Sequence, residues 1–222
     1  MDELNVIFRN THENYYYGEG LCYVLQDIFP DKIIRFRSVS DLSHEDAVSA
    51  GILILDLCRG EEYLCHRTLF DSHPGLLIGL TEGDIRPDRK GLPLCLQHML
   101  FICKNESPEK VREKIVQALA SAMGNSENMT GACRVSESCL HRSLSAQQKN
   151  VLDAVWQGLP VSQIARKFSL NQKMVYAHKR SVFLLFNLRV RSSLDLWLLR
   201  RQMEKISLPE GAGQKPCLFD AN

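Results

Sequence analysis

The stretch that decides the fold of the C-terminal part of this chain runs from residue 160 to residue 188 and reads PVSQIARKFSLNQKMVYAHKRSVFLLFNL. In its first half, apolar residues recur at helical spacing, at Val161, Ile164, Ala165 and Phe168. Ser169-Leu170-Asn171 then interrupts the pattern. Asn171 suits the N-cap of a second helix, because its side chain can accept hydrogen bonds from the free amides of the next turn. The stretch therefore predicts two helices around a tight break.

The second of these helices has an apolar side and a basic side. The residues that we expect to be buried, at i, i+3, i+7 and i+11, are Val175, His178, Val182 and Phe186. The outward side then carries Lys173, Tyr176, Ala177, Lys179 and Arg180. A short helix, a turn and a second helix with a basic outer face form the geometry that places side chains in a DNA major groove. On this pattern His178 is a core histidine rather than a metal ligand.

The charge of the chain is unevenly distributed, although its total is only +1. Residues 1–122 contain 13 Lys and Arg against 19 Asp and Glu, a net charge of −6. Residues 143–206 contain 11 Lys and Arg against 3 Asp and Glu, a net charge of +8. This asymmetry is typical of a nucleic-acid-binding unit joined to a unit that does not bind nucleic acid.

Composition excludes several classes of protein. No apolar run approaches the roughly 20 residues that a membrane span needs, and the acidic start MDELNVIFRN does not resemble a secretory signal. Eight cysteines include no CxxC pair, so we expect free thiols in a reducing cytoplasm and no zinc site. No Cys/His pairing, nucleophile elbow or Gly-rich phosphate loop is present, so we expect neither an enzyme nor a cofactor.

The N-terminal half alternates between strand and helix patterns. We expect strands at 4–8, 32–36, 52–55, 76–80 and 99–103, and helices at 15–29, 40–50, 61–70 and 107–122. This alternation predicts an α/β, doubly wound domain with a parallel sheet covered on both faces. Asp56, Thr81 and Lys104 are each the first polar residue after an apolar strand. They should therefore meet at the carboxyl edge of the sheet.

The remaining segments complete a two-domain organisation. Ser145 and Gln148 form a capping box at the start of a helix that ends at Gly158. A last helix, 191–206, places Leu194, Trp197, Leu198 and Arg201 at i, i+3, i+4 and i+7, and we expect Leu194 and Trp197 in the core. The Ser-, Asn- and Gly-rich segment 123–142 is a predicted flexible linker, and 207–222 a predicted disordered tail.

Residues 143–206 resemble the LuxR-type DNA-binding domain along LSAQQKNVLDAVWQGLPVSQIARKFSLNQKMVYAHKRSVF. Leu144-Ser145, Gly158, Ile164-Ala165, Val175 and His178 fall where that family has them. Met174, Tyr176 and Leu185 differ from the usual Thr, Lys and Lys. The resemblance implies an all-α, four-helix helix-turn-helix domain whose recognition helix spans about 172–186. DNA-contact candidates are Arg166, Lys167, Asn171, Lys173, Tyr176, Ala177, Lys179 and Arg180. The family often dimerises through the last helix, which makes Leu194, Trp197, Leu198 and Arg201 interface candidates.

Residues 4–122 resemble the flavodoxin-like receiver domain of two-component response regulators. The resemblance implies that Asp56 accepts phosphate, Thr81 senses it, Lys104 pairs with it and Phe101 is an aromatic switch. The acidic pair that holds Mg²⁺ in this family aligns with the neutral Asn10 and Thr11. Because Mg²⁺ needs several hard oxygen ligands, we expect a degenerate pseudo-receiver (residues 1–122) in which Asp56 and Lys104 form a structural ion pair.

The whole chain resembles a NarL/FixJ-type regulator, similar in layout to auxiliary regulators of the Rcs phosphorelay in enteric bacteria. We expect a bacterial, cytoplasmic transcriptional regulator that binds double-stranded DNA as a homodimer or as a heterodimer with a related response regulator, independently of its own phosphorylation. Two alternatives stay open. One is a phospho-regulated response regulator that uses Asp56, and the other is an interaction protein that captures a related regulator without binding DNA.

Overall fold

The computed structural model describes residues 2–10, 15–69, 74–83, 91–124, 142–189 and 192–207. The chain divides into two compact units, one made of residues 1–58 and 66–139 and the other of residues 59–65 and 140–222. The predicted linker 123–142 and tail 207–222 lie almost entirely outside the described residues. Across the described ranges, no helix is both long and apolar enough to cross a membrane.

The first unit contains a five-stranded, wholly parallel sheet in the order β2-β1-β3-β4-β5. Its strands are β1 (Glu3–Arg9), β2 (Ile33–Val39), β3 (Ile52–Asp56), β4 (Leu76–Thr81) and β5 (Leu100–Cys103). Every residue of the central strand β3 is buried. This explains why its first four residues, ILIL, are all apolar and do not alternate with polar ones. The five predicted strands are confirmed.

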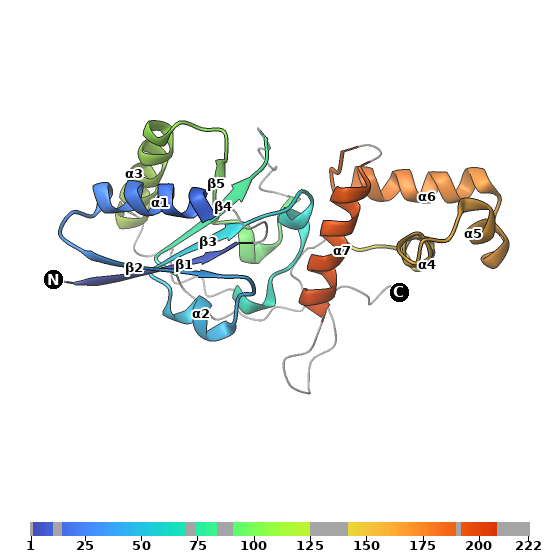
Figure 1. Ribbon diagram of the computed structural model, residues 1–222, viewed down its shortest axis with the longest axis horizontal. Coiled ribbons are helices and arrows are strands. Elements are labelled where there is room, and N and C mark those ends of the chain that lie inside the picture. The colour runs from blue at the N-terminus through green and yellow to red at the C-terminus, as the bar shows by residue number, and fades with distance from the viewer. Residues whose placement is uncertain are drawn as a thin grey trace. The chain divides into compact units, whose positions relative to one another are not determined.

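Helices lie on both sides of this sheet (Figure 1). Helices α1 (Tyr15–Ile28) and α3 (Pro108–Gly124) lie on one side, and the short α2 (His44–Ser49) lies on the other. A buried cluster joins α1 and α3 to the strands through Leu21, Leu25, Val111 and Ile115. Helix α2 begins later than the predicted residue 40, because Ser43 forms a capping box with Asp46.

The predicted helix 61–70 is wrong. The structure has two short 3₁₀ turns there, η1 (Glu61–Tyr63) and η2 (Arg67–Leu69), and Phe70 lies outside the described residues. The left-handed Gly60 (φ +92°) precedes the first turn, and the extended Leu64 ends it. All residues from 60 to 66 are buried. An amphipathic surface helix has an exposed polar face, and residues 60–66 have no exposed face. The burial of this segment therefore does not favour a surface helix.

The second unit contains the four predicted helices, α4 (Ala146–Trp156), α5 (Val161–Lys167), α6 (Gln172–Leu185) and α7 (Ser193–Ser207). The capping box of Ser145 and Gln148 is confirmed, and so is the turn at Gly158, whose φ of +77° suits glycine. The cluster that joins the first three helices consists of Val151, Ala154, Ile164, Ala165 and Val175.

Segment 59–65 belongs to this second unit. The guanidinium of Arg142 lies 3.4 Å from the centroid of the Tyr63 ring, and it also donates a hydrogen bond to the carbonyl of Leu185. A Cβ on Gly60 would lie 2.9 Å from a methyl carbon of Leu188. Only glycine therefore fits this position without a shift, because its backbone is left-handed as well as closely packed.

The described cysteines are free thiols. Cys58, Cys65, Cys95 and Cys103 are buried and Cys22 is half-buried, as small apolar residues would be. Cys133, Cys139 and Cys217 lie outside the described residues.

Candidate functional site

Helix α6 is set apart from α5 by a tight turn with local caps. Helix α5 ends at Lys167 with Phe168 as its C-cap, after which Ser169 has a φ of +55°. The amide of Leu170 donates to the carbonyl of Ala165 at 2.8 Å. Asn171 is the N-cap of α6, and its side-chain oxygen accepts from the amide of Met174 at 2.8 Å. The predicted break and cap are confirmed, so the direction of α6 is fixed by its own sequence.

The buried side of α6 anchors it to the rest of the unit. Val175, Val182 and Phe186 are at most 1% exposed, as predicted, and Phe183 is also buried. His178 is half-buried, so it lies at the border of the core rather than inside it. With this side held by packing, the opposite side of the helix must face outward.

The outward side of α6 is basic with apolar residues between the cations. Lys173, Tyr176, Ala177 and Arg180 are exposed, as predicted. Lys179 is half-buried, with its ammonium 5.9 Å from the centroid of the Phe183 ring. Tyr176 is 59% exposed and Met174 45% exposed, which is unusual for large apolar side chains of a packed helix. The helix therefore presents two exposed cations, Lys173 and Arg180, next to the exposed apolar side chains of Met174 and Tyr176.

Helix α5 adds two further cations. Arg166 and Lys167 are exposed on its last turn, and the ammonium of Lys167 lies 5.4 Å from the centroid of the Phe168 ring. Cations at this position suit contact with backbone phosphate, which orients a protein on a duplex without reading its sequence.

The cap of α6 provides a stability test. Asn171→Ala is expected to destabilise the second unit by about 1 kcal/mol, because the amide of Met174 loses its partner. Urea unfolding followed by the fluorescence of Trp156 and Trp197, the two tryptophans of the chain, would measure the loss. Asn171→Ser is the control, since serine caps well. Equal losses in both variants would show that the cap is not the cause.

Helix α7 buries a different face from the predicted one. The buried residues are Asp195, Leu196, Leu199, Gln202 and Met203. The predicted core residues Leu194 and Trp197 are 58% and 52% exposed, so that prediction is wrong. Arg201 is exposed with its guanidinium 5.8 Å from the centroid of the Trp197 ring, and Leu198 is half-buried. The stripe chosen from the sequence is thus the outer face of this helix.

Asp195 fixes the start of α7, and sequence reasoning missed it. The residue is 2% exposed, and its carboxylate accepts from the amide, Nε and Nη2 of Arg189. Burial favours the neutral acid, but the hydrogen bonds from Arg189 and Ser192 outweigh it and hold the pKa of Asp195 below its usual range. A single acidic residue in a basic segment was the signal that could have found it.

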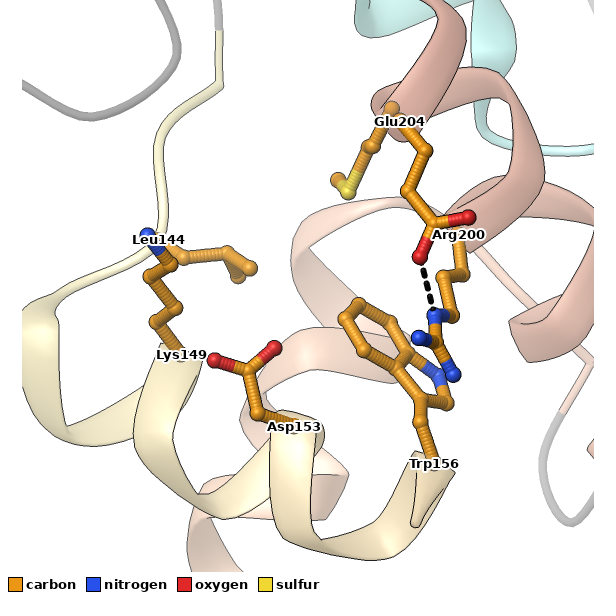
Figure 2. A pocket seen from close by; sticks show the side chains of 7 residues that line it. Leu144, Lys149, Asp153, Trp156, Arg200 and Glu204 are labelled. Carbon is orange, nitrogen blue, oxygen red and sulfur yellow. Dashed lines mark hydrogen bonds and ion pairs between the residues drawn. The ribbon is translucent and has the colours of Figure 1, made fainter. Parts of the chain in front are cut away.

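A cavity of about 190 Å³ lies between α4 and α7 (Figure 2). It is lined by Leu144, Lys149, Asp153, Trp156, Arg200, Met203 and Glu204. Arg200 pairs with Glu204 at 2.6 Å and lies 4.9 Å from the centroid of the Trp156 ring. The lining of the cavity has equal numbers of cationic and anionic side chains, and Arg200 is already paired with Glu204. The cavity therefore has no evident preference for a charged ligand.

In the first unit, the carboxyl edge of the sheet brings the predicted polar residues together. Asp56 ends β3 and is fully buried, and Thr81 ends the neighbouring β4 and is 3% exposed. Lys104 follows β5, and its ammonium lies 2.5 Å from Oδ1 of Asp56. The hydroxyl of Thr81 donates to the carbonyl of Ile102 at 3.5 Å. Phe101 is half-buried within β5. The expected ion pair of Asp56 and Lys104 is present.

Sequence reasoning missed a second cation at this edge. Arg9, the last residue of β1, is 6% exposed, and its Nη2 donates to the backbone carbonyl of Asp56 at 3.1 Å. Asn10 follows it and is half-buried, whereas Thr11 lies outside the described residues. The signal was available as an arginine directly after the apolar run Val6-Ile7-Phe8, since charged residues rarely end a buried strand without a partner.

The residues at this edge do not fit the Mg²⁺ that the receiver resemblance implies. The carboxylate of Asp56 is paired with Lys104, its carbonyl is engaged by Arg9, and Asn10 is neutral. The carboxylate of Glu106, two residues after Lys104, is held by Lys114 at 2.6 Å and by the amide of Cys103 at 3.0 Å. Within the described ranges, no group of three His, Cys, Asp or Glu side chains could hold a metal ion.

One family model matches part of the second unit. Residues 142–197 match the model of the luxR family of bacterial regulatory proteins. No curated protein matches the sequence. Among solved structures, the RcsB–DNA complex is 17% identical (TM-score 0.48), with 90% of this chain and 98% of that chain covered. RcsB of Salmonella enterica serovar Typhimurium bound to the rprA promoter is 19% identical (TM-score 0.46), with 90% and 99% covered. Response regulator StyR is 16% identical (TM-score 0.37), with 90% and 100% covered.

These TM-scores are below 0.5, so the likenesses carry no inference about function. The fold class is nevertheless confirmed, as a receiver-like parallel α/β sheet followed by a LuxR-type helix-turn-helix domain. The matched family consists of regulatory proteins, which agrees with the expectation that the chain is not an enzyme.

Proposed function

We propose that this chain is a transcriptional regulator that lays α6 in the major groove of duplex DNA and does not depend on phosphorylation of Asp56. The observation that carries the DNA-binding part is the exposure of Lys173 and Arg180 on one side of α6, within the segment that matches the luxR family. Regulation of transcription requires access to the chromosome, so we propose a bacterial cytoplasmic location.

The residues on this side divide into three roles. Lys173, Arg166 and Lys167 contact phosphates, where neutralisation releases counterions and supplies affinity without sequence preference. Arg180 reads guanine through paired hydrogen bonds. Tyr176 and Ala177 lie between these cations and contact thymine methyl groups or sugars. Asn171 and Lys179 border the surface, Asn171 as the cap and Lys179 along the helix.

We further propose that the outer face of α7 contacts a second subunit, either a copy of this chain or a related response regulator. Leu194 and Trp197 are more than half exposed, although both are large and apolar. Such residues on adjacent turns form a patch that water solvates poorly, and a partner subunit would cover it. Arg201, stacked on Trp197, would border this contact.

A specificity measurement tests the DNA-binding proposal. Duplexes selected from a random-sequence pool would serve as the probe, with scrambled duplexes as the reference. Arg180→Ala is expected to weaken binding to the selected site by about 1–3 kcal/mol and to relax the preference at one base pair. The control is Arg112→Ala, an exposed arginine of the first unit. If Arg180→Ala binds the selected site like the unaltered protein, α6 does not read DNA, and capture of another regulator becomes the better account.

A further inference from the structure

The exposed side chains between the two outward cations of α6 are apolar. Between Lys173 and Arg180 the exposed residues are Met174, Tyr176 and Ala177. Tyr176 is 59% exposed and Met174 is 45% exposed. The sequence between the two cations contains no Asn, Gln, Asp or Glu. This part of the helix therefore lacks the amide and carboxylate groups that read adenine and cytosine through hydrogen bonds.

The rotation of α6 about its own axis is fixed by its buried side. Val175, the residue before Tyr176, is 1% exposed, and Val182 is fully buried. Successive side chains of a helix point about 100° apart. The burial of Val175 and Val182 therefore keeps the ring of Tyr176 away from the core, and packing of the unit sets the side on which this ring lies.

Tyr176 has a cation one helical turn away in each direction. Lys173 lies three residues before it and Arg180 four residues after it, and both spacings make neighbours on a helix surface. Met174 has neither spacing to these two cations. Helix α6 contains no acidic residue, so a second copy of this surface would bring like charges together. The phosphate backbone of a duplex has the charge that this surface fits.

Among the base edges of the major groove, the apolar group is the C5-methyl group of thymine. We propose that Tyr176 reads this methyl group on a thymine within about two base pairs of the guanine that Arg180 reads. Four helical residues span about 6 Å, and base pairs are stacked about 3.4 Å apart. The inference rests on the proposed function and deepens it, because it names the base that the apolar part of α6 recognises.

Uracil substitution isolates the methyl contact, because uracil is thymine without the C5-methyl group. Each thymine of a duplex selected by the unaltered, full-length protein would be replaced by uracil in turn, and the dissociation constants compared at one salt concentration. Tyr176→Ala, Tyr176→Phe and Met174→Ala would be titrated with the same duplexes. Tyr176→Phe keeps the ring without the hydroxyl. Met174→Ala is the matched control, since it truncates another exposed apolar side chain of α6.

For the unaltered protein, we expect uracil at one or more positions near the guanine to weaken binding about fourfold, the effect of losing one buried methyl group. Tyr176→Ala should bind the thymine and uracil duplexes equally. Tyr176→Phe and Met174→Ala should keep the difference. Circular dichroism confirms folding, and Tyr176→Gln replaces Tyr176→Ala if that variant does not fold.

Equal affinity of the unaltered protein for the thymine duplex and for every uracil duplex overturns the inference, whatever the variants do. So does an undiminished difference in Tyr176→Ala, or a difference that is lost in Tyr176→Phe or in Met174→Ala. Equal binding of selected and scrambled duplexes by the unaltered protein would refute the proposed function together with the inference. Insensitivity to uracil with an intact preference for the selected duplex refutes the inference alone.

Discussion

Asp56→Asn is expected to destabilise the first unit by about 3–5 kcal/mol at neutral pH. The variant removes the carboxylate that lies 2.5 Å from the ammonium of Lys104, and it leaves that ammonium largely buried, with a side chain 13% exposed. Breaking a buried pair costs more than the pair contributes, because the remaining ion keeps its desolvation penalty. Chemical denaturation followed by far-ultraviolet circular dichroism would measure the change.

Two further variants separate this effect from simple loss of a carboxylate. Asp56→Asn combined with Lys104→Met should recover most of the lost stability, because no unbalanced ion pair member is left at that position. The exposed pair of Glu3 and Arg35, with side chains 47% and 65% exposed, is the matched control. Glu3→Gln should cost under about 1 kcal/mol. If Asp56→Asn left the free energy of unfolding unchanged, the ion pair would not stabilise this edge of the sheet.

Glu62→Gln is expected to remove a pH dependence of stability between about pH 4.5 and pH 7. Glu62 is 1% exposed and accepts a hydrogen bond from the amide of Gly60 at 2.8 Å. Burial raises its pKa from 4.5 to about 7, with the neighbouring Glu61 adding to the shift and Arg59 opposing it. The folded protein therefore binds this proton more tightly than the unfolded chain does, so stability falls as pH rises through this window.

The expected size follows from the shift between those two pKa values. It corresponds to roughly 3 kcal/mol of stability that is present below pH 4.5 and lost by pH 7. Urea unfolding at several pH values would show the slope flattening in Glu62→Gln, while Glu113→Gln, at an exposed position of α3, should leave it unchanged. Identical pH profiles for the unaltered protein and Glu62→Gln would contradict this account of the buried carboxyl.

Features that depend on local chemistry could be predicted from the sequence. The caps at Ser145 and Asn171 act within one helical turn, so a few consecutive letters contain the whole signal. The buried strand β3 is similarly visible, because a strand covered on both faces is apolar throughout. Its terminal Asp56 then locates the polar edge.

Features that depend on tertiary contacts could not be predicted from the sequence. Whether Leu194 or Leu196 faces inward on α7 depends on Asp195. The hydrogen bonds that Arg189 donates to the Asp195 carboxylate hold that residue on the inner side of the helix. Segment 61–70 has a helix-like composition, but the burial of every residue from 60 to 66, with Gly60 in a left-handed conformation, favours 3₁₀ turns. Arg9 was overlooked because its partner, the carbonyl of Asp56, is a backbone group that no side-chain pattern reveals.

The central claim is that the exposed cations of α6 meet the phosphates and bases of a duplex. The most direct measurement is the dissociation constant of a selected duplex over a series of salt concentrations, for the unaltered protein and for Lys173→Ala combined with Arg180→Ala. The account predicts a steep linear loss of log affinity with log salt, and a slope reduced by about 2 in the double variant. A flat salt dependence, or an unchanged slope in the double variant, would contradict it.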